Sequence, residues 1–237
     1  MSETTNFLTT VLGGKAASLV RLRAVGLPTP RGFVVTHALS AALAGADPSP
    51  LDTDANGNDA SASDRFLTAP FPPGFEAGLA ARLAALGGDR FSVRSSFAHE
   101  DRAGEVAAGL YDSVIDVPAA AVAQAVRRVL ASAVGAGARV YAATHGFSST
   151  APPLAVLVHA YLPAIAHGGA AAQSPDGDPT AIIVDVTSGA LDASNRAAIQ
   201  TALKRLCALH GPSETEWVVC AAGPAATPTK PTENHVV

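Results

Sequence analysis

The segment between residues 91 and 117 contains residues suited to binding a phosphate chain. Arg94 and two serines follow a short apolar run at 91–93, which predicts a buried strand. A stretch of small residues that includes Gly109 then precedes a second apolar run at 111–117. A guanidinium fork fits phosphate oxygens, and glycine lets backbone N–H groups approach them. The pattern fits a phosphate site at Arg94 and Gly109, and equally a hairpin with a solvated loop and a surface arginine.

A second candidate cation is Lys15, which follows two glycines and opens a helical pattern that continues to Val25. Its ammonium could bind a phosphate while the start of the helix contributes its dipole. The spacing of a Walker A loop is missing. Taken alone, the segment also fits an ordinary glycine turn with an exposed lysine.

Two carboxylates, Glu214 and Glu216, lie two residues apart in a predicted strand at 214–219. Alternate residues of a strand share one face. Such a pair can hold Mg²⁺, which prefers oxygen ligands and bridges nucleotide phosphates. The same sequence also fits two exposed glutamates on an edge strand.

Composition narrows the class of protein. The chain of 237 residues is 48% hydrophobic and 15% charged, and it fits one large domain or two small lobes. Its net charge of −4 argues against nucleic acid as a partner. Cys207 and Cys220 lack metal-site spacing, which favours a reducing cytoplasm. With no basic-then-apolar leader and no apolar run of spanning length, we expect no membrane association.

The elements that must position these residues alternate along the chain. Hydrophobic periodicity and turn residues predict a mixed α/β (α+β) fold. Besides the strands already named, strands are predicted at 32–36, 154–162 and 181–186, helices at 36–46, 74–86, 118–146 and 195–210, and a flexible loop at about 47–64, with irregular stretches at 66–73 and 167–180.

Two of these stretches together resemble a known family. Gly13-Gly14-Lys15-Ala16 with the later Gly26-Leu27-Pro28, and Val93-Arg94-Ser95-Ser96 with Glu100-Asp101 and Ala108-Gly109, resemble the nucleotide-binding domain of pyruvate phosphate dikinase and phosphoenolpyruvate synthase. Rifampin phosphotransferases share this domain. Glu214-Thr215-Glu216-Trp217 is similar to an Asp-x-Glu-Trp strand of the family.

The resemblance implies an ATP-grasp-like fold with a nucleotide cleft between two lobes, which we expect at 1–150 and 151–237. It implies ATP and Mg²⁺ as cofactors, with Lys15 and Arg94 on the phosphates. Glu214 and Glu216 would be the metal ligands. His159 and Tyr161 fall where the family has hinge or base-pocket residues, although a lone histidine on an apolar strand also fits a core residue.

The chain departs from the family after the second acid, where a glutamine and an arginine are expected. Pro228 and Lys230 stand there, so the charge is kept at Lys230 while Pro228 offers no side-chain ligand. No histidine lies in a phosphohistidine motif. The resemblance therefore implies an ATP-dependent phosphotransferase domain or subunit, acting on a histidine of a separately encoded phosphohistidine protein or on a small molecule. The alternatives are a non-catalytic nucleotide- or partner-binding protein, and an enzyme that activates a substrate directly.

Overall fold

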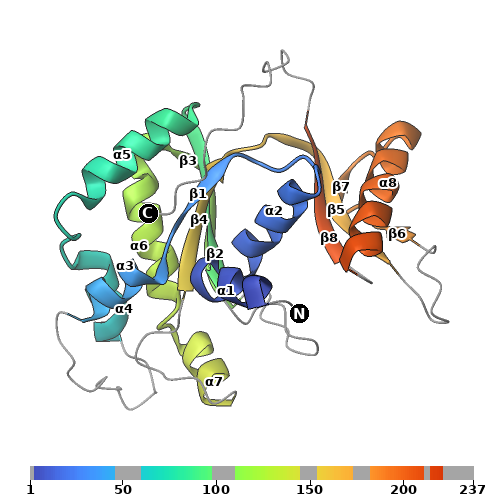
Figure 1. The fold of residues 1–237 in the computed structure, drawn as a ribbon. Helices are drawn as coiled ribbons and strands as arrows, with labels where there is room; N and C mark the ends of the chain where they lie inside the picture. Colours follow the sequence, from blue (N-terminus) through green and yellow to red (C-terminus); the bar gives the residue numbers. More distant parts are fainter. Residues whose placement is uncertain are drawn as a thin grey trace. The chain divides into compact units, whose positions relative to one another are not determined.

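The computed structural model describes residues 3–45, 60–97, 110–144, 154–172, 182–210 and 214–220 (Figure 1). It is a mixed α+β structure whose sheets are antiparallel. The chain forms two compact units. Unit 1 contains the described residues of 3–20 and 30–161, and unit 2 those of 21–29 and 162–220. The expected division at residue 150 lies outside the described residues.

Unit 1 is built on a four-stranded sheet in the order β1-β4-β2-β3. The strands are β1 (Gly32–Val35), β2 (Arg90–Phe97), β3 (Ser113–Pro118) and β4 (Leu154–Ala160). The expectation that the strand containing Phe91 ends before Arg94 is wrong. β2 continues to Phe97 because Ser95 and Ser96 pair with Val156 and Ala155 of β4, so the ladder stabilises polar residues that a hydrophobic pattern cannot assign.

One face of this sheet carries the larger core. Phe91, Val93, Phe97 and Val158 pack there with buried residues of α6 (Val122–Ser132), together with α3 (His37–Ala44), α4 (Ala60–Thr68) and α5 (Phe75–Leu86). The predicted helix at 118–146 is divided. A 3-10 turn at Ala119–Ala121 precedes α6, and α7 (Ala136–Thr144) follows a break at residues 133–135. Glycine at 135 lowers helix propensity at this break.

The irregular structure expected before Pro73 is wrong in part, because residues 60–68 form α4. Phe66, which is 3% exposed, anchors this helix in the core. Tertiary burial therefore outweighs the weak helix propensity of a segment rich in serine and aspartate.

The opposite face of the sheet is covered by α1 (Glu3–Leu12) and α2 (Gly14–Ala24). Leu12 and Ala16 pack there against Val34, Ala155 and Leu157. The polar start of the chain did not predict α1. The helical spacing of its apolar residues can be recognised only when the structure shows that Leu8, Val11 and Leu12 face one surface.

The described part of unit 2 is a smaller sheet packed against α8 (Ala193–His210). β5 (Ala164–Ala172) pairs with β6 (Ile182–Val184) and β7 (Ser188–Gly189), and also with β8 (Glu214–Cys220). α8 contributes Leu203 and Leu206 to a core with Ala166, Ala170 and Trp217. The loop expected from residue 167 is wrong as far as Ala172, because the small residues of β5 pair on both sides and so form a central strand.

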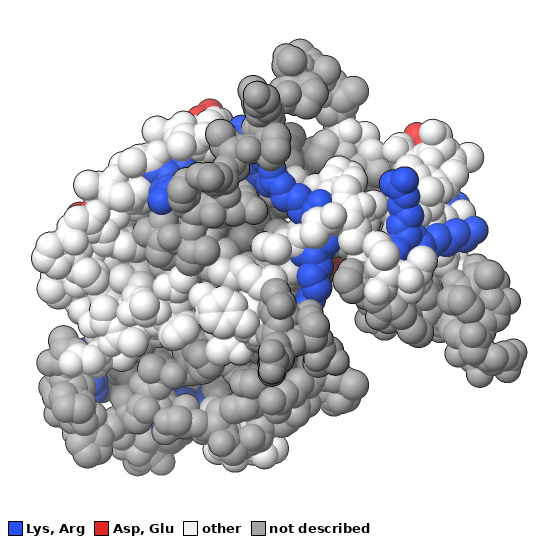
Figure 2. Space-filling view, in the orientation of Figure 1, with Lys and Arg blue, Asp and Glu red and all other residues white. Residues whose placement is uncertain are grey.

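No described helix combines the length and apolar character needed to cross a lipid bilayer. On the face drawn in Figure 2, lysine and arginine side chains lie in separate groups among uncharged surface.

Candidate functional site

A single buried hydroxyl joins α1, α2 and β2 in unit 1. Ser96 Oγ donates a hydrogen bond to the carbonyl of Leu12 at 2.8 Å and accepts one from the backbone N–H of Ala16 at 3.0 Å. The last carbonyls of a helix and the first N–H groups of the next lack partners within their own helices. Ser96, which is 0% exposed, supplies one partner to each helix. The start of α2 is thereby fixed on the strand.

The turn between the two helices requires glycine. Gly13 has φ +78°, and a Cβ added to it would lie 1.9 Å from the backbone oxygen of Ser96. Its carbonyl accepts a hydrogen bond from Ala17 N–H at 3.0 Å, which begins α2. The turn that carries Lys15 therefore lies in direct contact with β2, at a separation that a side chain would prevent.

Arg94 lies two residues before Ser96 on the same strand. Alternate residues share a face, so Arg94 and Ser96 both lie on the face that α1 and α2 cover. At about 3.3 Å per residue, their Cα atoms are roughly 7 Å apart. Lys15 and Arg94 are both partly buried. The structure thus places these two candidate residues on neighbouring backbone segments of one unit, which sequence separation alone did not require.

His159 lies on the same face as Arg94, where it pairs with Ser92 and is 7% exposed. Its Nδ1 lies 2.8 Å from the carbonyl oxygen of Ala160. Because that carbonyl can only accept, Nδ1 carries the proton of the neutral ring. Burial lowers the pKa of His159 below its ordinary value, Arg94 adds to the lowering, and the hydrogen bond to Ala160 opposes it. His159 is therefore a buried, neutral group beside Arg94.

Tyr161 follows β4 and is partly buried. Its backbone N–H donates to the carbonyl of Arg90 at 3.0 Å, which extends the pairing of β4 with β2 by one residue. Two other candidate residues, Gly109 and Lys230, lie outside the described residues, as does Pro228.

The two candidate metal ligands lie on β8 in unit 2. Trp217 is buried against the α8 side, and its Nε1 donates to the carbonyl of Gly169 at 2.9 Å. Glu216 is exposed, and the alternation of β8 places it on the face opposite to Trp217. The side chain of Glu214 lies outside the description.

The surface beside Glu216 is open. Glu216 pairs with Gly169, and a Cβ added to Gly169 would meet nothing within 4 Å. An oxygen ligand for Mg²⁺ would need such space for the waters that the ion retains. Among the described side chains, no group of three or more histidine, cysteine, aspartate or glutamate residues is placed to hold a metal ion.

Two residues of interest escaped sequence reasoning. The sequence places two hydroxyls next to Arg94, and nothing in it distinguishes Ser96 from Ser95. Asp185 donates its backbone N–H to the carbonyl of Gly169 at 2.9 Å and is exposed. It therefore neighbours the glycine that pairs with Glu216, a relation that only the strand register reveals.

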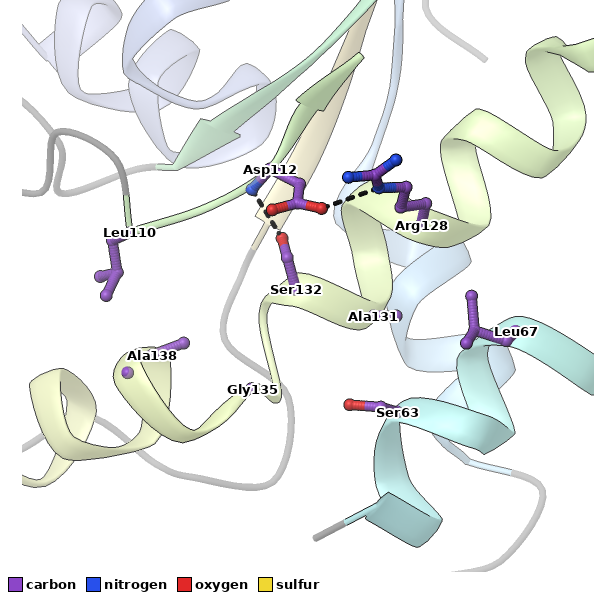
Figure 3. A pocket seen from close by; sticks show the side chains of 10 residues that line it. Ser63, Leu67, Leu110, Asp112, Arg128, Ala131, Ser132, Gly135 and Ala138 are labelled. Carbon is purple, nitrogen blue, oxygen red and sulfur yellow. Dashed lines mark hydrogen bonds and ion pairs between the residues drawn. The ribbon is translucent and has the colours of Figure 1, made fainter. Parts of the chain in front are cut away.

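A cavity of about 360 Å³ lies in unit 1 among α4, α6 and the segment that follows α6 (Figure 3). Arg128 Nε donates to Asp112 Oδ2 at 2.9 Å, and Asp112 N–H donates to Ser132 Oγ at 3.0 Å. Both side chains that hold Asp112 belong to α6. The cavity is therefore on the α6 side of the sheet, away from the face of Arg94 and Ser96.

Comparison with protein families finds one match. The model of the family described as pyruvate phosphate dikinase, AMP/ATP-binding domain, matches residues 9–194. The matched range includes Lys15, Arg94, His159 and Tyr161 and stops before the carboxylates of β8. A comparison with curated proteins finds no match.

Proposed function

We propose a function from one premise: the chain belongs to the pyruvate phosphate dikinase, AMP/ATP-binding domain family. Membership makes it an AMP/ATP-binding domain of that family. The finer proposal is an ATP-grasp-like domain that binds ATP with Mg²⁺ and transfers a phosphoryl group. The acceptor would be a histidine of a separate phosphohistidine protein or a small molecule.

The observation that supports this proposal is the attachment of the Gly13–Lys15 turn to β2. Ser96 binds both sides of the turn, and Arg94 lies on the same strand face. An ammonium and a guanidinium that leave neighbouring backbones can share one polyphosphate. Arg94 would contribute a fork of donors and Lys15 a compact charge. Their role is to orient the phosphates and to stabilise charge as it moves toward the leaving group.

Unit 2 would contribute the metal ligands. Glu214 and Glu216 are carboxylates two residues apart on β8, and the space at Gly169, which pairs with Glu216, is open. When bound, Mg²⁺ would neutralise charge on the phosphate oxygens. We propose that His159 lines the site near Arg94 as an uncharged side chain, with Tyr161 two residues later in the chain.

One observation favours a second function. By the resemblance of the sequence to the family, Pro228 stands where a glutamine is expected, and proline has no side-chain donor or acceptor. A protein that binds nucleotide or a partner without turning nucleotide over would tolerate that substitution.

Calorimetric titration with a non-hydrolysable ATP analogue, with and without Mg²⁺, tests the proposal. We expect binding that strengthens with Mg²⁺, and about tenfold weaker binding in Arg94→Ala and in Lys15→Ala, which corresponds to 1.4 kcal/mol. Arg90→Ala is the matched control, since Arg90 lies on the same strand and its Nε is held by Asp116 at 2.7 Å. Absence of binding in both conditions would refute the proposal.

A turnover assay separates the two functions. Formation of ADP or AMP with ATP and Mg²⁺, in the presence of a phosphohistidine domain or a small acceptor, would support phosphotransfer. Tight binding without any product would instead support the non-catalytic alternative.

A further inference from the structure

We infer that Ser96 is a positioning residue for polyphosphate binding: its hydroxyl sets the place of the Lys15 turn relative to Arg94. The inference rests on the proposed function, because it assumes that both cations bind one nucleotide. It assigns to Ser96 no contact with the ligand.

The first support is the chemistry of the two hydrogen bonds. One hydroxyl donates to the carbonyl of Leu12 and accepts from the N–H of Ala16. The two bonds use its single proton and one of its two lone pairs. Leu12 and Ala16 are on opposite sides of the turn. A side chain that bonds to both sides fixes where the turn sits, whereas a bond to one side would permit it to pivot.

The second support is the close approach at Gly13, which does not depend on the hydroxyl. The backbone of Gly13 lies so near that of Ser96 that a Cβ would overlap its carbonyl oxygen at 1.9 Å. The turn is therefore seated on the backbone of β2 and held there by the hydroxyl. Both restraints act at residue 96, two positions from Arg94.

The third support is the contrast with Ser95. Ser95 is 1% exposed and Ser96 0%, so burial does not separate them. Alternation places Ser95 on the α6 side with Val93 and Phe97, whereas Ser96 faces α1 and α2. Two neighbouring buried serines thus lie on opposite faces of one strand, and Ser96 is on the face of the segment that carries Lys15.

The consequence is specific to ligands with a phosphate chain. Misplacement of Lys15 relative to Arg94 weakens binding of a ligand that needs both cations. It leaves unchanged the contacts that a shorter ligand makes elsewhere. A purely structural serine would instead lower the affinity for every nucleotide through loss of folded protein.

The test compares dissociation constants for AMP and for a non-hydrolysable ATP analogue with Mg²⁺, measured by calorimetry on the full chain. In Ser96→Ala we expect the preference for the ATP analogue over AMP to fall about tenfold, which corresponds to 1.4 kcal/mol, while the constant for AMP stays within about twofold. Ser95→Ala should keep the preference of the parent. An unchanged preference in Ser96→Ala, or an equal loss for both ligands, would overturn the inference.

A second pair of variants covers the case in which Ser96→Ala does not fold. Thr and Val have similar shapes and differ in the hydroxyl, so Ser96→Thr should keep the preference that Ser96→Val loses. If both apolar variants fail to fold while parent and Ser96→Thr fold, the hydroxyl serves the fold and the inference is wrong. If the parent protein binds neither ligand, the proposed function is wrong. That result differs from the results that overturn the inference about Ser96, so the two failures can be told apart.

Discussion

Two adjacent arginines on α6 show how environment, and not residue type, sets the contribution of a side chain. Arg127 NH1 donates to the carbonyls of Phe66 and Ala69, and its guanidinium lies 3.7 Å from the ring centroid of Phe71. Arg128 makes an ion pair with Asp112, and both side chains are largely exposed. Arg128 therefore lies on the solvent side of α6, whereas Arg127 ties the end of α4 to α6.

We therefore predict that Arg127→Ala lowers the free energy of unfolding by about 2 kcal/mol, because it removes charged hydrogen bonds and a cation–π contact. Arg128→Ala is the control and should change this free energy by less than about 1 kcal/mol. Urea unfolding of both variants measures the difference. Equal values for the two would show that the carbonyl contacts of Arg127 contribute little.

His159 makes stability depend on pH. Its pKa is lowered in the folded protein, chiefly by burial, so the unfolded chain binds a proton at a higher pH than the folded chain does. This contribution to stability is complete above about pH 6.5, the ordinary value for histidine. It is lost progressively as the pH falls from there toward the lowered pKa.

We predict that His159→Gln flattens the stability curve in this range. Urea titration at pH 7.5 and pH 5.5 measures the free energy of unfolding of parent and variant. Between these pH values the free energy should change less in the variant than in the parent. This difference should exceed the difference between the two proteins at pH 7.5. Parallel curves would mean that another group carries the dependence.

At the scale of elements, β5 tolerates side chains unequally at two neighbouring glycines. A Cβ on Gly168 would lie 2.0 Å from the carbonyl oxygen of Asp185 and 2.7 Å from the Trp217 ring. At Gly169 the space is open. The close approach at Gly168 brings the chain after β6 against β5, so this glycine determines how tightly unit 2 is packed.

Gly168→Ala should destabilise unit 2 by about 2 kcal/mol or more, because atoms of the backbone must move. Gly169→Ala should stay within about 0.5 kcal/mol of the parent. Thermal unfolding followed by fluorescence of Trp217, the single tryptophan of the chain, reports on this unit. A loss at Gly169 as large as that at Gly168 would contradict the prediction.

The sequence predicts elements well where burial follows a simple period. The apolar letters of β4 and the helical period of α5 and α8 are visible without a structure. β5 is not, since alanine and glycine carry no strand preference and only the pairing partners identify it. The candidate cations Lys15 and Arg94 could be named from local motifs. The contact between the backbone segments that carry them could not, because it depends on Ser96 and Gly13, whose contacts span residues far apart in the chain.

At the scale of the whole molecule, the proposal needs residues from both units. Lys15 and Arg94 belong to unit 1, and Glu214 and Glu216 to unit 2. A ligand that binds the folded chain through Lys15 and Arg94 would stabilise the fold by mass action, with a gain of about 2.7 kcal/mol at a ligand concentration one hundred times the dissociation constant.

We predict that the ATP analogue with Mg²⁺ raises the unfolding temperature of the chain, measured by circular dichroism, and that Arg94→Ala removes this gain. Lys204→Ala, a loss of an exposed positive charge on α8, should retain it. An unfolding temperature that rises equally in parent and Arg94→Ala would show that the ligand binds without Arg94.

Helix α2 belongs to unit 1 at its start and to unit 2 at its end, where Leu22 packs against the core formed with Leu206 and Trp217. On the ribosome, these partners emerge long after Leu22. At about 5–20 residues per second, the delay is on the order of 10–40 s. The last turns of α2 lack their packing surface for all of that time, whereas β2, the partner of the first turn, is complete at residue 97. Translation thus separates in time two halves of a helix that are continuous in the finished protein.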